Sequence, residues 1–174
     1  MSHTLICYDG SPSARHAIQV AAHSLAHDHT LLLNVWNLPE RVHADSFSFD
    51  KQTGVDDDQL RRRSIDRAQE ILAEGRAFAK TLGFELETRA EPNRSSVPAT
   101  VLEVADELDS DVILIGTHGS TAADRDLLGS VSQALASHSH RPVMIVPVPA
   151  PTARAAAAAT AESTLRPAPV RDAA

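Results

Sequence analysis

The sequence predicts an α/β fold built around an open, mainly parallel sheet with helices on both of its faces. Short apolar runs alternate with segments of helical periodicity along residues 1–148. One of these runs, Val112–Ile115, is apolar throughout, which is typical of a parallel strand that is covered on both faces. The chain has 174 residues, of which 43% are hydrophobic, and this is enough for one domain with a substantial core.

The first two predicted strands enclose a capped helix. Thr4–Tyr8 is an apolar run followed by Asp-Gly-Ser-Pro-Ser, which indicates a buried strand that ends in a turn. Ser11 is a favourable N-cap for a helix whose first residue is Pro12. The apolar run Leu31–Trp36 predicts the second strand. Residues 39–55 show no periodicity and contain Pro, Gly, Ser and Asp, so they predict a long loop.

A long helix and a half-exposed strand are predicted after this loop. Apolar residues recur at helical spacing along the inner face of the helix: Leu60, Ile65, Ala68, Leu72, Ala79 and Leu82. Gly83 is predicted to end the helix. From Phe84 to Arg89, uncharged residues alternate with charged ones, which predicts a strand with one exposed face.

The rest of the domain continues the alternation. A helix is predicted over Val97–Leu108, with Pro98 in its first turn, and the strand Val112–Ile115 follows. A glycine-rich loop leads to a helix over Ser130–Ser137 and a last strand over Val143–Val146. Strands and helices in this order predict right-handed βαβ units.

The composition changes after this domain. Pro, Ala, Thr and Arg dominate residues 149–174, which predicts a flexible tail rather than a second domain. The net charge of −7 argues against general binding to nucleic acids or anionic membranes. No apolar run is long enough to span a membrane, and the first residues lack the features of a signal peptide. These features predict a cytoplasmic protein.

The chain contains a single cysteine, Cys7, so no disulfide can form within it. This agrees with a reducing compartment. Cys7 lies in an apolar run, which predicts a small buried core residue rather than a reactive thiol. No set of side chains predicts a metal site of the protein's own: His23 and His27 have metal-ligand spacing, but nothing else completes a tetrahedral set.

Two segments at the predicted carboxyl ends of strands have the composition of a ligand site. One is Tyr8–Ser11 and the other runs from Gly116 to Ser132. In open α/β sheets, ligands bind at this edge, where the strand order reverses. Asp9 is predicted either to contact a ligand or to cap the turn. His118 is predicted either to touch a phosphate or to face solvent.

The second segment has the character of a phosphate loop. Gly116 and Gly119 allow a close approach of the backbone, and Gly129 with Ser130 opens a helix whose N–H groups and dipole suit phosphate. Ser130 and Ser132 add hydroxyl donors. The spacing matches neither a Walker A motif nor the dinucleotide fingerprint, so a purely structural turn is an alternative on this evidence alone.

The spacing Gly116-x2-Gly119-x9-Gly129-Ser130 resembles the ATP-binding signature of the universal stress protein family. Other segments resemble that family in the same order: Asp9-Gly10-Ser11, Leu33-Asn34-Val35, Asp111–Gly116, Leu127–Ser132 and Arg141–Pro147. The resemblance covers residues 1–148. It implies a Rossmann-like, five-stranded sheet in the order 3-2-1-4-5, and ATP or another adenine nucleotide as ligand, accompanied by Mg²⁺.

The resemblance also implies where the nucleotide lies. Adenine is expected near Val35, and the ribose near Asp9 and Gly116. The phosphates are expected on the backbone of Gly119, Gly129, Ser130 and Val131, with Ser132 nearby. The expected nucleotide-binding residues are Asp9, Gly10, Ser11, Val35, Gly116, His118, Gly119, Gly129, Ser130, Val131 and Ser132. A homodimer through Val143–Val146 is implied as well, because an unpaired apolar edge strand is a liability.

The sequence thus predicts an ATP-binding stress-response protein that acts as a regulator or sensor. No Ser-His-Asp or Cys-His set, arginine finger or base for an attacking water is recognisable, so at most slow ATP hydrolysis is expected. One alternative is a dimeric interaction protein of the same fold that binds no nucleotide. Asp124 and Asp126 motivate it, because acids near a triphosphate oppose binding. A slow ATP hydrolase is the other alternative.

Overall fold

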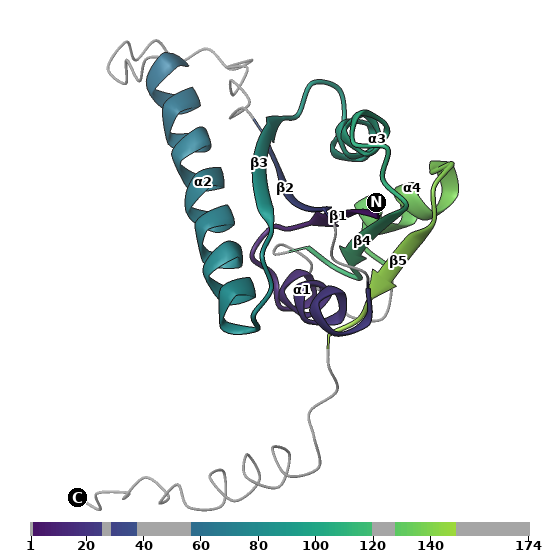
Figure 1. The fold of residues 1–174 in the computed structure, drawn as a ribbon. Coiled ribbons are helices and arrows are strands. Elements are labelled where there is room, and N and C mark those ends of the chain that lie inside the picture. Colours follow the sequence, from purple (N-terminus) through teal and green to yellow (C-terminus); the bar gives the residue numbers. More distant parts are fainter. Residues whose placement is uncertain (1, 26–28, 38–56, 120–127, 149–174) are drawn as a thin grey trace, which may run out of the picture.

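A five-stranded parallel sheet forms the centre of the fold (Figure 1). The computed structural model describes residues 2–25, 29–37, 57–119 and 128–148. Within them the strands pair in the order β3-β2-β1-β4-β5, and every pairing is parallel. The strands are β1 (His3–Cys7), β2 (His29–Trp36), β3 (Glu87–Pro92), β4 (Val112–Gly116) and β5 (Val143–Val146). The predicted strand order and direction are confirmed.

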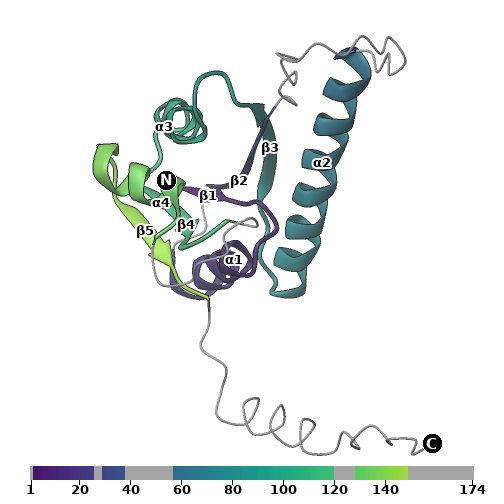
Figure 2. The same cartoon turned by 180° about the vertical axis from the view of Figure 1, so that it is seen from behind.

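Two helices cover each face of this sheet (Figures 1 and 2). The helices are α1 (Pro12–Ser24), α2 (Asp57–Thr81), α3 (Val97–Glu107) and α4 (Ser130–His138). One hydrophobic cluster joins α1 and α2 to the sheet, and a second joins α3 and α4 to it. The predicted arrangement with helices on both faces is therefore confirmed.

Alternating side chains of the central strands supply the two cores. Ile6 of β1 packs with α1 and α2, whereas its neighbour Leu5 packs with α3 and α4. In β4, Leu114 and Ile113 divide in the same way. This division follows from the two-residue period of a strand, and it explains why consecutive residues in the middle of these strands are apolar.

The predicted start of the third strand is wrong. Phe84 and Leu86 are buried as predicted, but the strand begins only at Glu87 and extends to Pro92. The Phe84 amide donates to the Ala79 carbonyl at 3.0 Å, and Gly83 has a φ of +69°. These residues therefore close the end of α2, and their alternation reflects burial under the helix end rather than strand pairing.

Several sequence predictions lie outside the described residues: the loop over 39–55, the tail over 149–174, His27, and the acids Asp124 and Asp126. Strand β5 is at the sheet edge as expected, but the dimer itself stays a prediction. In the described part of the chain, no helix is both long and apolar enough to cross a bilayer. The cytoplasmic location and the exclusion of nucleic acid also stay predictions.

The strand order reverses between β1 and β4, since β1 pairs with β2 on one side and with β4 on the other. The chain leaves β1 into α1, which lies on one face, whereas the segment after β4 leads to α4 on the other face. The two connections therefore diverge at the carboxyl ends of neighbouring strands. This is the place where open α/β sheets bind ligands.

Candidate functional site

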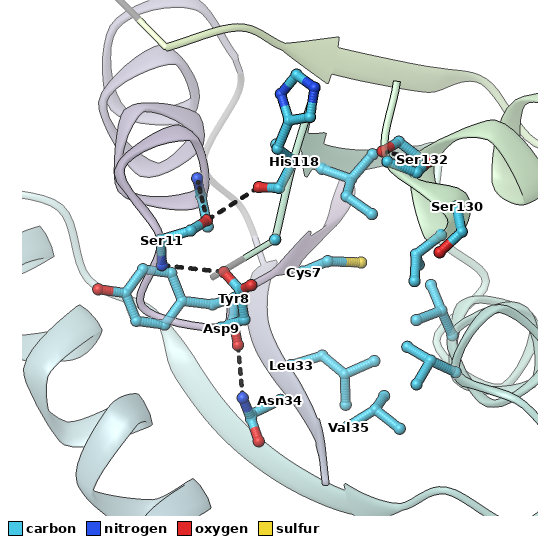
Figure 3. A pocket seen from close by; sticks show the side chains of 18 residues that line it. Cys7, Tyr8, Asp9, Ser11, Leu33, Asn34, Val35, His118, Ser130 and Ser132 are labelled. Carbon is cyan, nitrogen blue, oxygen red and sulfur yellow. Dashed lines mark hydrogen bonds between the residues drawn. The ribbon is translucent and has the colours of Figure 1, made fainter. Parts of the chain in front are cut away.

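A cavity of about 340 Å³ lies at this switch point (Figure 3). Its walls come from the carboxyl ends of β1, β2 and β4 and from α1, α3 and α4. The lining residues are Cys7, Tyr8, Asp9, Ser11, Ala14, Leu33, Asn34, Val35, Val97, Val101, Ile115, Gly116, His118, Gly119, Gly129, Ser130, Val131 and Ser132. The volume is within the range of small-molecule sites.

All the residues predicted to bind a nucleotide line this cavity except Gly10. Gly10 lies in the turn after β1 with a φ of +80°, and a Cβ atom there would face Ile71 of α2 rather than the cavity. Gly10 therefore does not line the cavity, and its part in nucleotide binding stays a prediction. Glycine is required at this position because a left-handed backbone conformation disfavours other residues.

One end of the cavity is apolar. It is lined by Leu33 and Val35 of β2 and by Val97 and Val101 of α3, which pack in one hydrophobic cluster. Of these four residues only Val35 is predicted from the sequence, because residues of an apolar helix face look the same in the sequence whether they fill a core or line a cavity. This end of the cavity suits a flat, weakly polar ring.

The turn after β1 is held by side chains that also reach the cavity. An oxygen of the Asp9 carboxylate accepts a hydrogen bond from the Ser11 amide at 3.0 Å, and the buried Asn34 amide donates to the Tyr8 carbonyl at 2.7 Å. Asp9 thus stabilises the turn, which is one predicted role, and it also lines the cavity, as the other role requires. The two alternatives are compatible.

Gly116 is a glycine for reasons of packing. A Cβ atom on it would lie 2.3 Å from the Ser13 hydroxyl oxygen and 2.8 Å from the Ala14 amide nitrogen. The missing side chain therefore lets the first turn of α1 pack directly on the end of β4. The glycine spacing predicts a close approach of a ligand at this position, whereas in the structure the missing Cβ of Gly116 faces the protein.

The hydroxyl of Ser132 has a different partner from the one predicted. It donates to the Thr117 carbonyl at 3.0 Å and to the Gly129 carbonyl at 3.2 Å, and the side chain is buried. The Gly129 amide donates to the same Thr117 carbonyl at 2.7 Å. These bonds fix the start of α4 against the end of β4, so the hydroxyl hydrogen of Ser132 is already engaged within the protein.

The first turn of α4 has no side-chain cap within the described residues. Ser11 and Ser96 cap α1 and α3 with their hydroxyls, whereas the N-cap of α4 is Gly129, which has no side chain to accept a hydrogen bond. Among the described residues, nothing accepts from the amides of Ser130, Val131 and Ser132. These residues line the cavity, and amides at the positive end of a helix dipole are suited to an anion.

His118 lies at the polar side of the cavity, and its imidazole points away from Leu33 and Val35 (Figure 3). Its Nδ1 atom bonds with the Thr117 hydroxyl at 3.0 Å. Its Nε2 atom is buried and has no partner within the described parts of the chain. The ring is therefore half-buried rather than the solvent-facing residue of one predicted alternative.

Cys7 packs against the hydrophobic core as predicted, but it is half-buried rather than fully buried, and it also lines the cavity. Burial, with the charge of Asp9 as a smaller contribution, raises the pKa of the thiol to about 12. We expect alkylation by iodoacetamide at pH 8 to be at least about 100-fold slower in the folded protein than in urea, because only the thiolate reacts. Mass spectrometry reads this directly, since the chain has no other cysteine. Equal rates in both states would contradict the assignment.

Comparisons with known proteins agree with this geometry. The profile of the universal stress protein family matches residues 1–147. A universal stress protein of Staphylococcus saprophyticus is 30% identical over 144 residues, which is 81% of this chain and 80% of the relative. A universal stress protein of Methanocaldococcus jannaschii is 33% identical over 81 residues, so the match spans 46% of each of the two chains.

Solved structures share the fold. A universal stress family protein from Burkholderia pseudomallei superposes with a TM-score of 0.62 at 22% identity, covering 84% of this chain and 96% of the other. The Arabidopsis thaliana family protein with AMP bound gives 0.58 at 15% identity, covering 90% and 99%. The Archaeoglobus fulgidus protein in complex with dAMP gives 0.56 at 20% identity, covering 84% and 97%. With the family profile matching nearly the whole described fold, this chain belongs to the universal stress protein family.

Proposed function

We propose that this protein binds an adenine nucleotide in the cavity at the switch point and acts as a nucleotide-dependent regulator or sensor in a stress response. The observation that carries the proposal is the first turn of α4, which no side chain of the described residues caps and which lies at a cavity with an apolar far end. The family structures from Arabidopsis thaliana and Archaeoglobus fulgidus hold AMP and dAMP, which supports the same ligand class here.

The two ends of the cavity match the two ends of such a ligand. Leu33, Val35 and Val101 offer an apolar slot for the adenine ring. The amides of Gly119 and of the first turn of α4 offer donors for phosphate oxygens. Asp9 also lines the cavity, and its carboxylate can accept from ribose hydroxyls.

ATP with Mg²⁺ is the specific ligand that we propose. Asp9 is the only acidic side chain among the described lining residues, and carboxylates together with phosphate oxygens are the ligands that Mg²⁺ prefers. The same lining contains no arginine or lysine in the described part of the chain. Enzymes that transfer phosphoryl groups use arginine or lysine side chains to stabilise the transition state, so this lining supports binding of ATP rather than its rapid hydrolysis.

Thermal melting tests the proposal. At a ligand concentration of 100 times Kd, binding to the folded state alone adds about 2.7 kcal/mol of stability. We therefore expect Mg-ATP to raise the Tm by roughly 5–10 °C. Magnesium with tripolyphosphate is the control for a general anion effect, and it should produce a much smaller shift. Unchanged melting with ATP, ADP and AMP, together with no nucleotide released from the purified protein, would favour the nucleotide-free interaction protein.

A further inference from the structure

We propose that Ser13 is a positioning residue for phosphate binding: its buried hydroxyl orients the Gly119 amide toward the phosphate without touching the ligand. The inference rests on the proposed function and adds a residue that does not line the cavity. Ser13 is 1% exposed and belongs to the first turn of α1. Neither the spaced glycines nor the lining of the cavity points to it.

The contacts of Ser13 lead to the loop after β4. Its hydroxyl donates to the His118 carbonyl at 2.7 Å, and the Ser11 hydroxyl donates to the same oxygen at a longer 3.3 Å. Ser11 is also engaged as the N-cap of α1, since its hydroxyl accepts from the Ala14 amide at 3.2 Å. Ser13 therefore supplies the shorter bond to this carbonyl.

The direction of this carbonyl determines where the next amide points. In a trans peptide the C=O and the following N–H point in opposite directions, and the described chain has no cis peptide bond. Because the His118 carbonyl points at α1, the Gly119 N–H points away from α1. Figure 3 shows the His118 carbonyl directed to the Ser11 side, with Ser130 of α4 across the cavity.

The preceding peptide is held from the opposite side. The Thr117 carbonyl accepts from the Ser132 hydroxyl at 3.0 Å and from the Gly129 amide at 2.7 Å, both at the start of α4. Two consecutive carbonyls are thus anchored to two different helices. A peptide rotation in this segment would break at least one buried hydrogen bond, so the Gly119 amide is held in one orientation before a ligand arrives.

Glycine at position 116 makes room for this contact. A Cβ atom on Gly116 would lie 2.3 Å from the Ser13 hydroxyl oxygen. At this distance the two atoms overlap, so the strand end or Ser13 would have to move. The small residue and the buried serine therefore act together. This pairing gives Ser13 a role beyond filling space, because its hydroxyl reaches the carbonyl only where the strand end lacks a side chain.

Calorimetry with Mg-ATP and with adenosine, which lacks the phosphates and their metal ion, tests the proposal. We expect Ser13→Ala to weaken binding of Mg-ATP by about tenfold, since one hydrogen bond that orients a donor is lost. Binding of adenosine should change less than about twofold, because the apolar end is untouched. Ser110→Ala is the matched control: Ser110 is also 1% exposed, but it precedes β4 at the opposite end of the sheet. It should leave both affinities unchanged.

The amide signal of Gly119 gives a second measurement that does not need adenosine binding. In ¹H–¹⁵N spectra, we expect Mg-ATP to shift the Gly119 proton downfield in the wild type and clearly less in Ser13→Ala. An equal loss of affinity for ATP and adenosine, with equal Gly119 shifts, would assign Ser13 a merely structural role and overturn the inference. A wild-type protein that binds no adenine nucleotide would instead overturn the proposed function, and the inference with it.

Discussion

Replacing Gly116 by alanine should lower the free energy of unfolding by about 3 kcal/mol, the upper part of the range for overpacked sites. The new methyl group would lie 2.8 Å from the Ala14 amide nitrogen as well as 2.3 Å from the Ser13 hydroxyl oxygen. The Ala14 nitrogen belongs to the backbone and cannot rotate away as a side chain can, so α1 must move away from the sheet. Urea denaturation measures the loss, and the Tm should fall by roughly 6–12 °C.

Gly119→Ala is the matched control for this substitution. A Cβ atom on Gly119 would meet only a carboxylate oxygen of Asp9, at 3.0 Å, and that side chain can adjust. We expect a change in unfolding free energy below about 1 kcal/mol. If Gly116→Ala were as stable as Gly119→Ala, the packing explanation of Gly116 would be wrong, and ligand approach would again be the best reason for this glycine.

Replacing Ser130 by proline should weaken Mg-ATP binding by about 10- to 100-fold, because it removes one amide donor from the first turn of α4. The helix itself should tolerate the change. Proline is favoured at the first position of a helix, as Pro12 in α1 illustrates. The preceding residue, Gly129, has φ −61° and ψ 151°, which is the conformation that a following proline requires.

The control for this variant is Ser130→Ala, which removes the hydroxyl and retains the amide. Its affinity should be much closer to that of the wild type, and both variants should melt like the wild type without ligand. Equal affinity of Ser130→Pro and wild type, measured by calorimetry, would exclude this amide as a phosphate donor. Gly129→Val is a poorer choice, because a Cβ atom on Gly129 would lie only 3.1 Å from the Thr117 carbonyl oxygen.

Much of the fold could be predicted from the sequence because its signals are local and repeated. The apolar run Val112–Ile115 and the capped helix at Ser11 correspond to β4 and α1. The predicted start of the third strand at Phe84 is wrong, because Phe84 and Leu86 are buried by the closure of α2 and not by strand pairing. An alternating pattern records which side chains are buried, but it does not record whether the backbone pairs with another strand.

The sequence also located most of the candidate site, since glycines and serines at strand ends mark the places where the chain turns. It did not separate the roles of these residues. Gly10 serves a left-handed turn and Gly116 serves packing, whereas Gly119 lines the cavity. One residue type answers three physical needs, and only the neighbours in space distinguish them.

By itself, the sequence determined the alternation of strands and helices, the family and the two segments that meet at the switch point. These follow from periodicity, capping and turn chemistry, which act between residues close in the chain. The tertiary structure alone decided that Val97 and Val101 line the cavity, that the Ser132 hydroxyl is engaged, and that Ser13 holds a carbonyl 105 residues away. Such contacts depend on how α1, α3 and α4 pack on the sheet, and packing between distant segments leaves no periodic pattern in a single sequence.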